Sequence, residues 1–194
     1  MIPGMNRFVF AAAIPLALCA CTTTPPSKWV EGGARLAFPR ARWVVGDTAI
    51  DVVPNGAVFA NSEIILKIDG SGRVTDQNNA PVALLQADGK LVGNGDELLG
   101  NVGIVNASLP DEDRAWITVL PTGEVLRYME DGERLNFGAW LGCGAPQVHL
   151  TCTLITHLLG MRIKEEQDRA RAMGTYYRGS PISTTNGMGL GPPY

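Results

Sequence analysis

The chain has 194 residues, which suits one domain with short appendages. Hydrophobic residues make up 45% and can fill one core, while charged residues make up only 18%, below the roughly 25% of an average soluble domain. The formal net charge is −3 and the chain has no basic cluster, which argues against nucleic acid as a partner, because a phosphate backbone requires a basic surface. The 23 glycines and 13 prolines favour many turns over long helices.

Residues 1–20 have the pattern of a secretory signal peptide. One cation, Arg7, precedes an almost wholly apolar run from Phe8 to Ala20. This run is too short to cross a bilayer comfortably as a helix. Translation from Met5 instead of Met1 would give a more compact signal of the same kind.

The signal ends in Leu18-Cys19-Ala20-Cys21, which resembles the bacterial lipobox. The resemblance implies cleavage before Cys21, a diacylglycerol thioether on its sulfur and a third acyl chain on its new amino group. Acyl chains anchor a protein stably, since each buried CH₂ contributes about 0.8 kcal/mol. The alternatives are an ordinary cleaved signal with an incidental cysteine and an apolar helix of a cytoplasmic protein.

The residues after Cys21 predict an address and a tether. Thr22 takes the position at which Asp tends to retain a lipoprotein in the inner membrane, so we expect sorting to the outer membrane. The segment Thr22–Lys28 contains two prolines and no hydrophobic pattern, which is typical of a flexible to semi-extended linker. We therefore assign residues 21–42 to a lipidated tether.

Short apolar runs separated by glycine turns dominate residues 43–142. Ile50–Val58 and Ile117–Val125 match closely, and Ile65–Val74 and Leu84–Leu91 share their outline. Each segment is an aliphatic run, a turn with glycine and a second run, which is the pattern of a β-hairpin.

The turn glycines at 56, 72, 89 and 123 are 16, 17 and 34 residues apart, so a degenerate unit is expected near Ile104–Leu109. Regular turn spacing in an all-β domain is the alternative to true repetition. The turn style resembles lipoproteins of myxobacteria and their relatives with repeated Asp-Gly hairpins, a likeness that implies no activity. Both interpretations predict a mainly β fold, an antiparallel meander or small open barrel of repeated hairpins.

Helical spacing begins near residue 147. Apolar residues from Val148 to Ile163 form one stripe, and the pairs Lys164–Asp168 and Arg162–Glu166 follow it. Gly160 could kink or break this helix. We expect residues 143–175 to form a helix that closes one face of the β domain, and residues 176–194 to form a disordered tail, because they lack both charge and pattern after Arg178.

Cys143 and Cys152 remain after lipidation of Cys21, and the oxidising compartment of an exported protein allows them to pair. We expect a disulfide; free thiols are the alternative. His149 and His157 complete a spacing that superficially suggests zinc, but it fits no common zinc arrangement, so we expect no metal.

No sequence motif in the chain indicates catalysis. It lacks G-x-S-x-G, S-x-x-K and H-E-x-x-H, so we predict no catalytic residues and no cofactor. The acidic triplet Asp111–Asp113 lacks the alternating ligands of a calcium loop and is interpreted as a solvated turn.

These observations predict a non-enzymatic envelope lipoprotein whose β domain binds another envelope protein or a glycan, or contributes structure. One alternative is a β cup for a small apolar or glycan ligand, with the helix as its lid. A cavity of about 300 Å³ or more would favour the cup, and a filled core would argue against it. The other alternative is an unrecognised hydrolase using His149 or His157. Exposed tryptophans would support the cup, and the candidates are Trp29, Trp43, Trp116 and Trp140.

Overall fold

A computed structural model describes residues 24–178 of the chain, with side chains up to Arg169. The predicted signal peptide, Cys21 and residues 179–194 lie outside the described residues. The strands are β1 (Ala41–Val45), β2 (Thr48–Val52), β3 (Ala57–Ala60), β4 (Glu63–Ile68), β5 (Arg73–Thr75), β6 (Pro81–Leu85), β7 (Lys90–Gly93), β8 (Leu98–Val102), β9 (Asn106–Ser108), β10 (Ile117–Val119), β11 (Glu124–Tyr128) and β12 (Arg134–Leu141). One 3₁₀ turn, η1 (Asn94–Asp96), and one helix, α1 (Pro146–Arg178), complete the fold.

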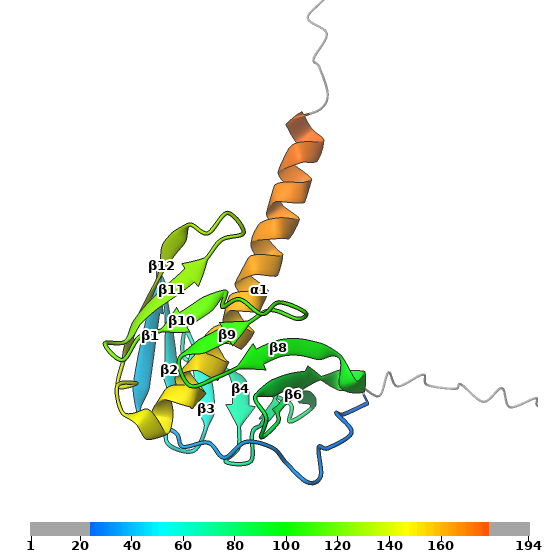
Figure 1. Cartoon of the computed structure of the whole chain (residues 1–194), viewed down its shortest axis with the longest axis vertical. Helices are drawn as coiled ribbons and strands as arrows, with labels where there is room; N and C mark the ends of the chain where they lie inside the picture. The colour runs from blue at the N-terminus through cyan, green and yellow to red at the C-terminus, as the bar shows by residue number, and fades with distance from the viewer. Residues whose placement is uncertain (1–23, 179–194) are drawn as a thin grey trace, which may run out of the picture.

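The twelve strands form an antiparallel meander that closes into a barrel (Figure 1). Each strand pairs with its sequence neighbours, and β1 pairs with β12 so that Trp43 lies opposite Trp140. The antiparallel meander with a C-terminal helix is confirmed. The barrel is closed and not open, because β1 pairs with β12. Local sequence patterns do not reveal this pairing, so they could not distinguish the two forms.

The repeated hairpins are also present, and their turn glycines share one environment. Gly56 has a φ of 81°, and its carbonyl accepts a 2.9 Å hydrogen bond from the N–H of Ile68. A Cβ at Gly56 would overlap the carbonyl oxygen of Ile68, and a Cβ at Gly123 would overlap that of Trp140. Glycine is therefore required both for the left-handed backbone and for the close approach of the neighbouring strand.

The same hydrogen bond recurs from one hairpin to the next. The carbonyls of Gly72, Gly89 and Gly123 accept from Leu85, Val102 and Trp140 at 2.7–2.9 Å. At the degenerate unit Val105 takes the place of the glycine, and its carbonyl accepts from Val119 at 2.8 Å. The repeat therefore exists as a structural unit, and in the degenerate unit a valine replaces glycine at the position whose carbonyl accepts this hydrogen bond.

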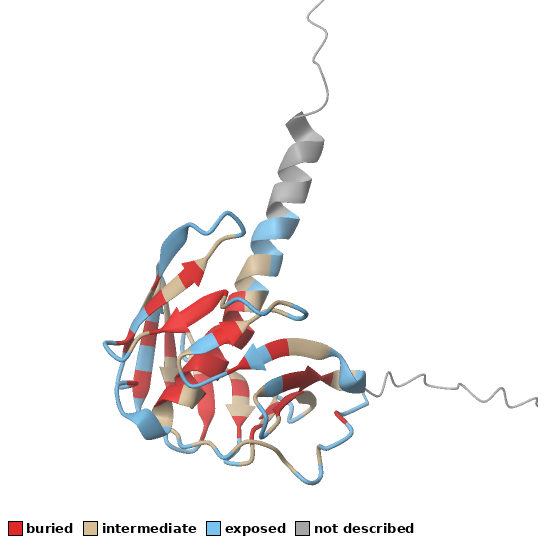
Figure 2. Ribbon diagram, in the orientation of Figure 1, coloured by how far each residue is buried: buried red, intermediate tan, exposed pale blue. Residues whose placement is uncertain are grey.

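The first half of α1 lies inside the barrel. Every residue from Thr151 to Gly160 is buried, so the helix is enclosed on all sides there, and it leaves the barrel at one end (Figure 2). We call this end the mouth. The prediction of a C-terminal helix packed on the β domain is confirmed, and the barrel wall covers the other faces of this half as well as its apolar stripe.

Helix α1 continues through Gly160, where the sequence suggested a kink or break. A Cβ at this position would lie 2.8 Å from Ile117 Cδ1 and 3.1 Å from Trp116 Cη2. Glycine therefore allows the helix to pass close to the wall at the mouth, and it does not end the helix.

The segment assigned to a tether is bound to the barrel over most of its length. The carbonyl of Thr24 accepts a 2.9 Å hydrogen bond from Gly95, and the N–H of Ser27 donates to Asp96 Oδ1 at 2.8 Å. Farther along, Gly33 and Ala34 donate to carbonyls of strand and turn residues. Residues 24–40 thus form a strap across hairpin turns, which local sequence patterns cannot reveal because its partners lie far away in the chain.

Candidate functional site

The enclosed part of α1 carries four polar side chains, and each has a hydrogen-bond partner; they are Thr151, Thr153, Thr156 and His157. Thr151 and Thr153 donate to the carbonyls of Ala37 and Ile104 at 2.8 and 2.7 Å, and Thr156 accepts from Trp140 Nε1 at 2.8 Å. Because a buried polar group without a partner is costly, these bonds fix the rotation and depth of the helix in the barrel.

His157 is one of the two buried histidines. Its Nδ1 accepts a 2.7 Å hydrogen bond from Trp116 Nε1, and its Nε2–H donates to the carbonyl of Leu99 at 2.9 Å. Burial lowers the pKa of His157 to about 4, because the interior disfavours the charged form. At neutral pH His157 is therefore a neutral side chain, and its two hydrogen bonds connect α1 to Trp116 and Leu99.

His149 lies deeper in the barrel, near the start of α1. Its Nδ1 lies 2.9 Å from the carbonyl oxygen of Cys143 and its Nε2 lies 2.7 Å from that of Val119. Within the described residues, neither histidine has a carboxylate or a serine as hydrogen-bond partner. All four ring nitrogens are engaged by backbone or by tryptophan, which is a structural arrangement.

A disulfide joins Cys143 to Cys152, with Cα atoms 6.3 Å apart. It connects the end of β12 to the second turn of α1. The two cysteines are thus paired with each other, and no cluster of metal-ligating side chains is found in the part of the chain that the structure describes. The zinc-like spacing with His149 and His157 therefore brings together a disulfide and two core histidines.

The acidic triplet lies in the loop between β9 and β10. Asp111 has a φ of 58°, and Glu112 forms an ion pair with Arg114 at 3.3 Å. Of the triplet, Glu112 lines a cavity at the mouth.

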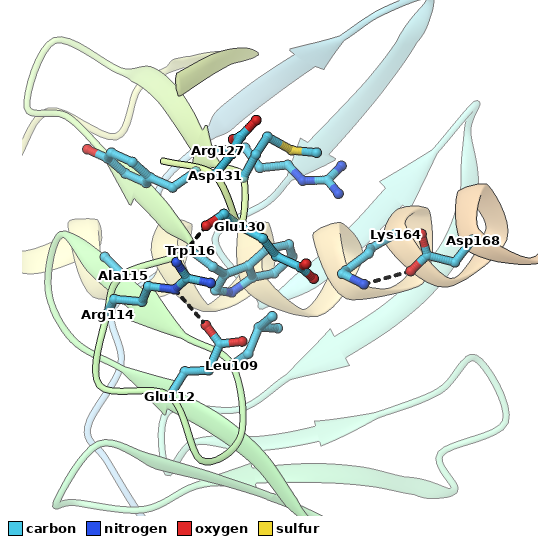
Figure 3. Close-up of a pocket in the computed structure, with 12 residues that line it drawn as sticks. Leu109, Glu112, Arg114, Ala115, Trp116, Arg127, Glu130, Asp131, Lys164 and Asp168 are labelled. Atoms are coloured by element: carbon cyan, nitrogen blue, oxygen red, sulfur yellow. Dashed lines mark hydrogen bonds and ion pairs between the residues drawn. The ribbon is translucent and has the colours of Figure 1, made fainter. Parts of the chain in front are cut away.

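A cavity of about 360 Å³ opens at the mouth between α1, the loop before β10, strand β11 and the turn after it (Figure 3). Its apolar wall includes Leu109, Trp116 and Met129. Charged residues from the loops, from β11 and from α1 surround this wall. They are Glu112, Arg114, Arg127, Glu130, Asp131, Lys164 and Asp168. The interior cup expected for a ligand is filled by α1, and the cavity lies at the mouth instead.

Arg127 is the unusual residue of this mouth cavity. The alternation of β11 points Val125 and Arg127 into the barrel, and Arg127 is only 7% exposed. Its Cζ lies 5.9 Å from the ring centroid of Trp116 and 5.7 Å from that of Phe137, and its Nη1–H donates to Gln167 Oε1 at 3.1 Å. The guanidinium is thus held by two aromatic faces and one amide.

The other two cations of the mouth cavity are paired. Arg114 bonds Glu112 and also donates to the carbonyl of Glu130 at 3.0 Å, while Lys164 bonds Asp168 at 2.6 Å (Figure 3). These ion pairs are exposed and contribute little energy, because water screens them. They leave Arg127 as the cation on the buried wall.

A second cavity of about 350 Å³ lies on the other side of α1. Its lining is more apolar and includes Trp43, Ile50, Phe137, Leu159 and Ile163. Phe137 and Gln167 line this second cavity and also contact Arg127, so Arg127 stands between the two cavities.

The tryptophan candidates are corrected in part. Trp43, Trp116 and Trp140 are buried, because they fill the barrel around α1, and Trp29 is half-buried in the strap. Only Trp116 combines burial with a place in the mouth cavity. Sequence reasoning missed Arg127, although the alternation Val125-Leu126-Arg127 in a strand places a cation on the same face as a core valine.

Comparison with known proteins adds no relative. No protein family matches the chain, and neither a curated protein nor a solved structure is significantly similar to it. Among residues 24–178, no helix combines the length and the apolar character needed to cross a bilayer.

Proposed function

We propose that the chain is a lipid-anchored, non-enzymatic protein of the bacterial cell envelope, whose barrel binds another envelope component or contributes structure. The observation that carries the proposal is the Leu18–Cys21 pattern at the end of a short apolar run. Thr22 favours the outer membrane as the destination. The disulfide Cys143–Cys152 is compatible with an oxidising compartment.

The strap supports a close attachment to the membrane. Thr24 and Ser27 are already bonded to η1, and Thr24 is only three positions after Cys21. A fully extended chain of that length spans at most about 11 Å. Lipid on Cys21 would therefore hold the η1 side of the barrel next to the headgroups, and not at the end of a long tether.

The engagement of both histidines supports a non-catalytic barrel. A general base needs a ring nitrogen within reach of a nucleophile or of substrate. The nitrogens of His149 and His157 bond backbone carbonyls and Trp116 inside the barrel. We therefore favour binding or structure over the hydrolase alternative.

Metabolic labelling with palmitate tests the anchor. The wild-type protein should incorporate label, a Cys21→Ala variant should not, and a Cys19→Ala variant should retain it as the matched control. Label that persists in Cys21→Ala would falsify the lipid anchor.

Binding of a small ligand at the mouth is the second candidate function. The specific observation in its favour is the mouth cavity of about 360 Å³, which lies within the range of small-molecule sites. The test is calorimetric titration of the full chain with small aromatic ligands, with a variant that fills the cavity, Ala115→Trp, as the control. Equal heats for both proteins would remove this candidate.

A further inference from the structure

Arg127 carries a charge that the fold does not neutralise. Among the described side chains, from Thr24 to Arg169, no carboxylate lies within ion-pair distance of its guanidinium. Buried arginine is rare unless it is paired, because removing its charge from water is costly. The two aromatic faces and Gln167 offset part of this cost.

The guanidinium of Arg127 also has N–H groups that make no hydrogen bond within the described residues. Arginine has five N–H groups, and in the described structure one hydrogen bond, from Nη1 to Gln167, is made. The planar fork of N–H groups matches the oxygens of a carboxylate or a phosphate. Since Arg127 lines the mouth cavity, an anionic group that enters the cavity can complete its hydrogen bonds.

We infer that the mouth cavity binds an amphiphilic anion, with its carboxylate or phosphate on Arg127 and its apolar body against Trp116 and Leu109. This inference rests on the second candidate function, ligand binding at the mouth, and is independent of the lipid anchor. The apolar wall excludes a small bare ion as the best fit, because such an ion would leave Leu109, Trp116 and Met129 uncovered.

The acidic residues around the cavity do not prevent anion binding. Glu112 and Asp168 are neutralised by Arg114 and Lys164, and Glu130 and Asp131 are exposed at the turn between β11 and β12. Water and salt screen the exposed carboxylates. The interaction with Arg127 takes place on the buried wall, where screening is weaker and the attraction is stronger.

The experiment compares charged and uncharged probes of nearly the same shape. The full chain is titrated calorimetrically with phenylacetate, with phenyl phosphate and with phenylacetamide, which lacks the charge. The variants are Arg127→Met and Arg127→Lys, and Arg114→Met is the matched control because it removes an equal charge from the rim of the same cavity.

We expect at least one of the two anions to bind the wild type about tenfold or more tightly than phenylacetamide, as a charge-assisted hydrogen bond implies. Arg127→Met should abolish this preference, and phenylacetamide should still bind through the apolar wall, which shows that the cavity is intact. Arg127→Lys should keep part of the preference, and Arg114→Met should keep nearly all of it. The stronger of the two anions identifies the head group.

Three results would overturn the inference. Equal binding of charged and uncharged probes to the wild type would leave the cavity as a ligand site but remove the anion. Loss of the preference in Arg114→Met to the same extent as in Arg127→Met would assign it to the charge of the rim. Absence of binding by all three probes would remove both the inference and the second candidate function.

Discussion

The two halves of α1 share one continuous helix but depend on different forces. From Thr151 to Gly160 every residue is buried, and threonine and histidine side chains bond the barrel wall. From Arg162 to Arg169 most residues are exposed, and the side-chain interactions include the Lys164–Asp168 ion pair and the hydrogen bond that Gln167 accepts from Arg127. The comparison teaches that the (i, i+4) spacing of charges within the helix accounts for the ion pair of the second half. The environment of the first half is determined by the barrel around it.

The largest effect that sharpens this comparison is expected at the enclosed half. Leu154→Ala removes a fully buried side chain from inside the barrel and should lower the free energy of unfolding by about 3 kcal/mol, through lost burial and the remaining cavity. Glu165→Ala, on the exposed half, is the control and should change it by less than about 0.5 kcal/mol. Chemical denaturation measures both, and similar losses would contradict the division of α1.

The pH dependence of the free energy of unfolding tests the buried contacts of His157 with Trp116 and Leu99. The pKa of His157 is about 4 in the folded protein and 6.5 as the ordinary value, so between these values the unfolded chain binds the proton and the folded chain does not. The free energy of unfolding should therefore fall by about 3 kcal/mol as the pH falls from 6.5 to 4. Above pH 6.5 this contribution is fully present.

His157→Gln is the control for this dependence, because an amide can accept from Trp116 and donate to Leu99 without taking up a proton in this range. Denaturation at pH 7 and at pH 4.5 should give a smaller difference for the variant than for the wild type. The carboxyl of Asp51, whose pKa is lowered by hydrogen bonds from Arg42, stabilises the fold above its ordinary pKa of 3.8 and loses this contribution only as the pH falls below that value. A variant with the same pH slope as the wild type would assign the slope to other groups.

The disulfide should have a somewhat smaller effect. Its loop spans 9 residues in sequence, and loss of such a constraint in Cys143→Ser/Cys152→Ser should lower the free energy of unfolding by about 2–3 kcal/mol. Peptide mass spectrometry before and after reduction checks the bond itself. Two free thiols in the mature protein would contradict it.

The smallest effect is expected at the exposed half. Lys164→Ala removes the ion pair with Asp168 and should change the free energy of unfolding by less than about 0.5 kcal/mol, because both partners are partly solvated. Urea unfolding in low and high salt measures this. A loss above about 1 kcal/mol would show that the exposed half is energetically part of the barrel.

Several elements could be predicted from local sequence. The hairpins around Gly56 and Gly123 follow from aliphatic runs and turn glycines, and the helix after residue 146 follows from its apolar spacing. The mouth cavity could not be predicted, because its lining brings together Trp116 from the loop before β10, Arg127 from β11 and Lys164 from α1. The strap escaped prediction for the same reason, since Thr24 bonds Gly95, far along the chain.

By itself, the sequence determined which segments become strands and helix and where their turns lie, because side-chain period and glycine conformation act over a few residues. It also contains the Leu18–Cys21 pattern, on which we base the proposed lipid anchor and which lies outside the described residues. Only the tertiary structure decided that β1 meets β12, that α1 is enclosed and that Arg127 is buried beside two aromatic rings. These features depend on closing the barrel, which brings together residues whose separation in sequence leaves no local signal.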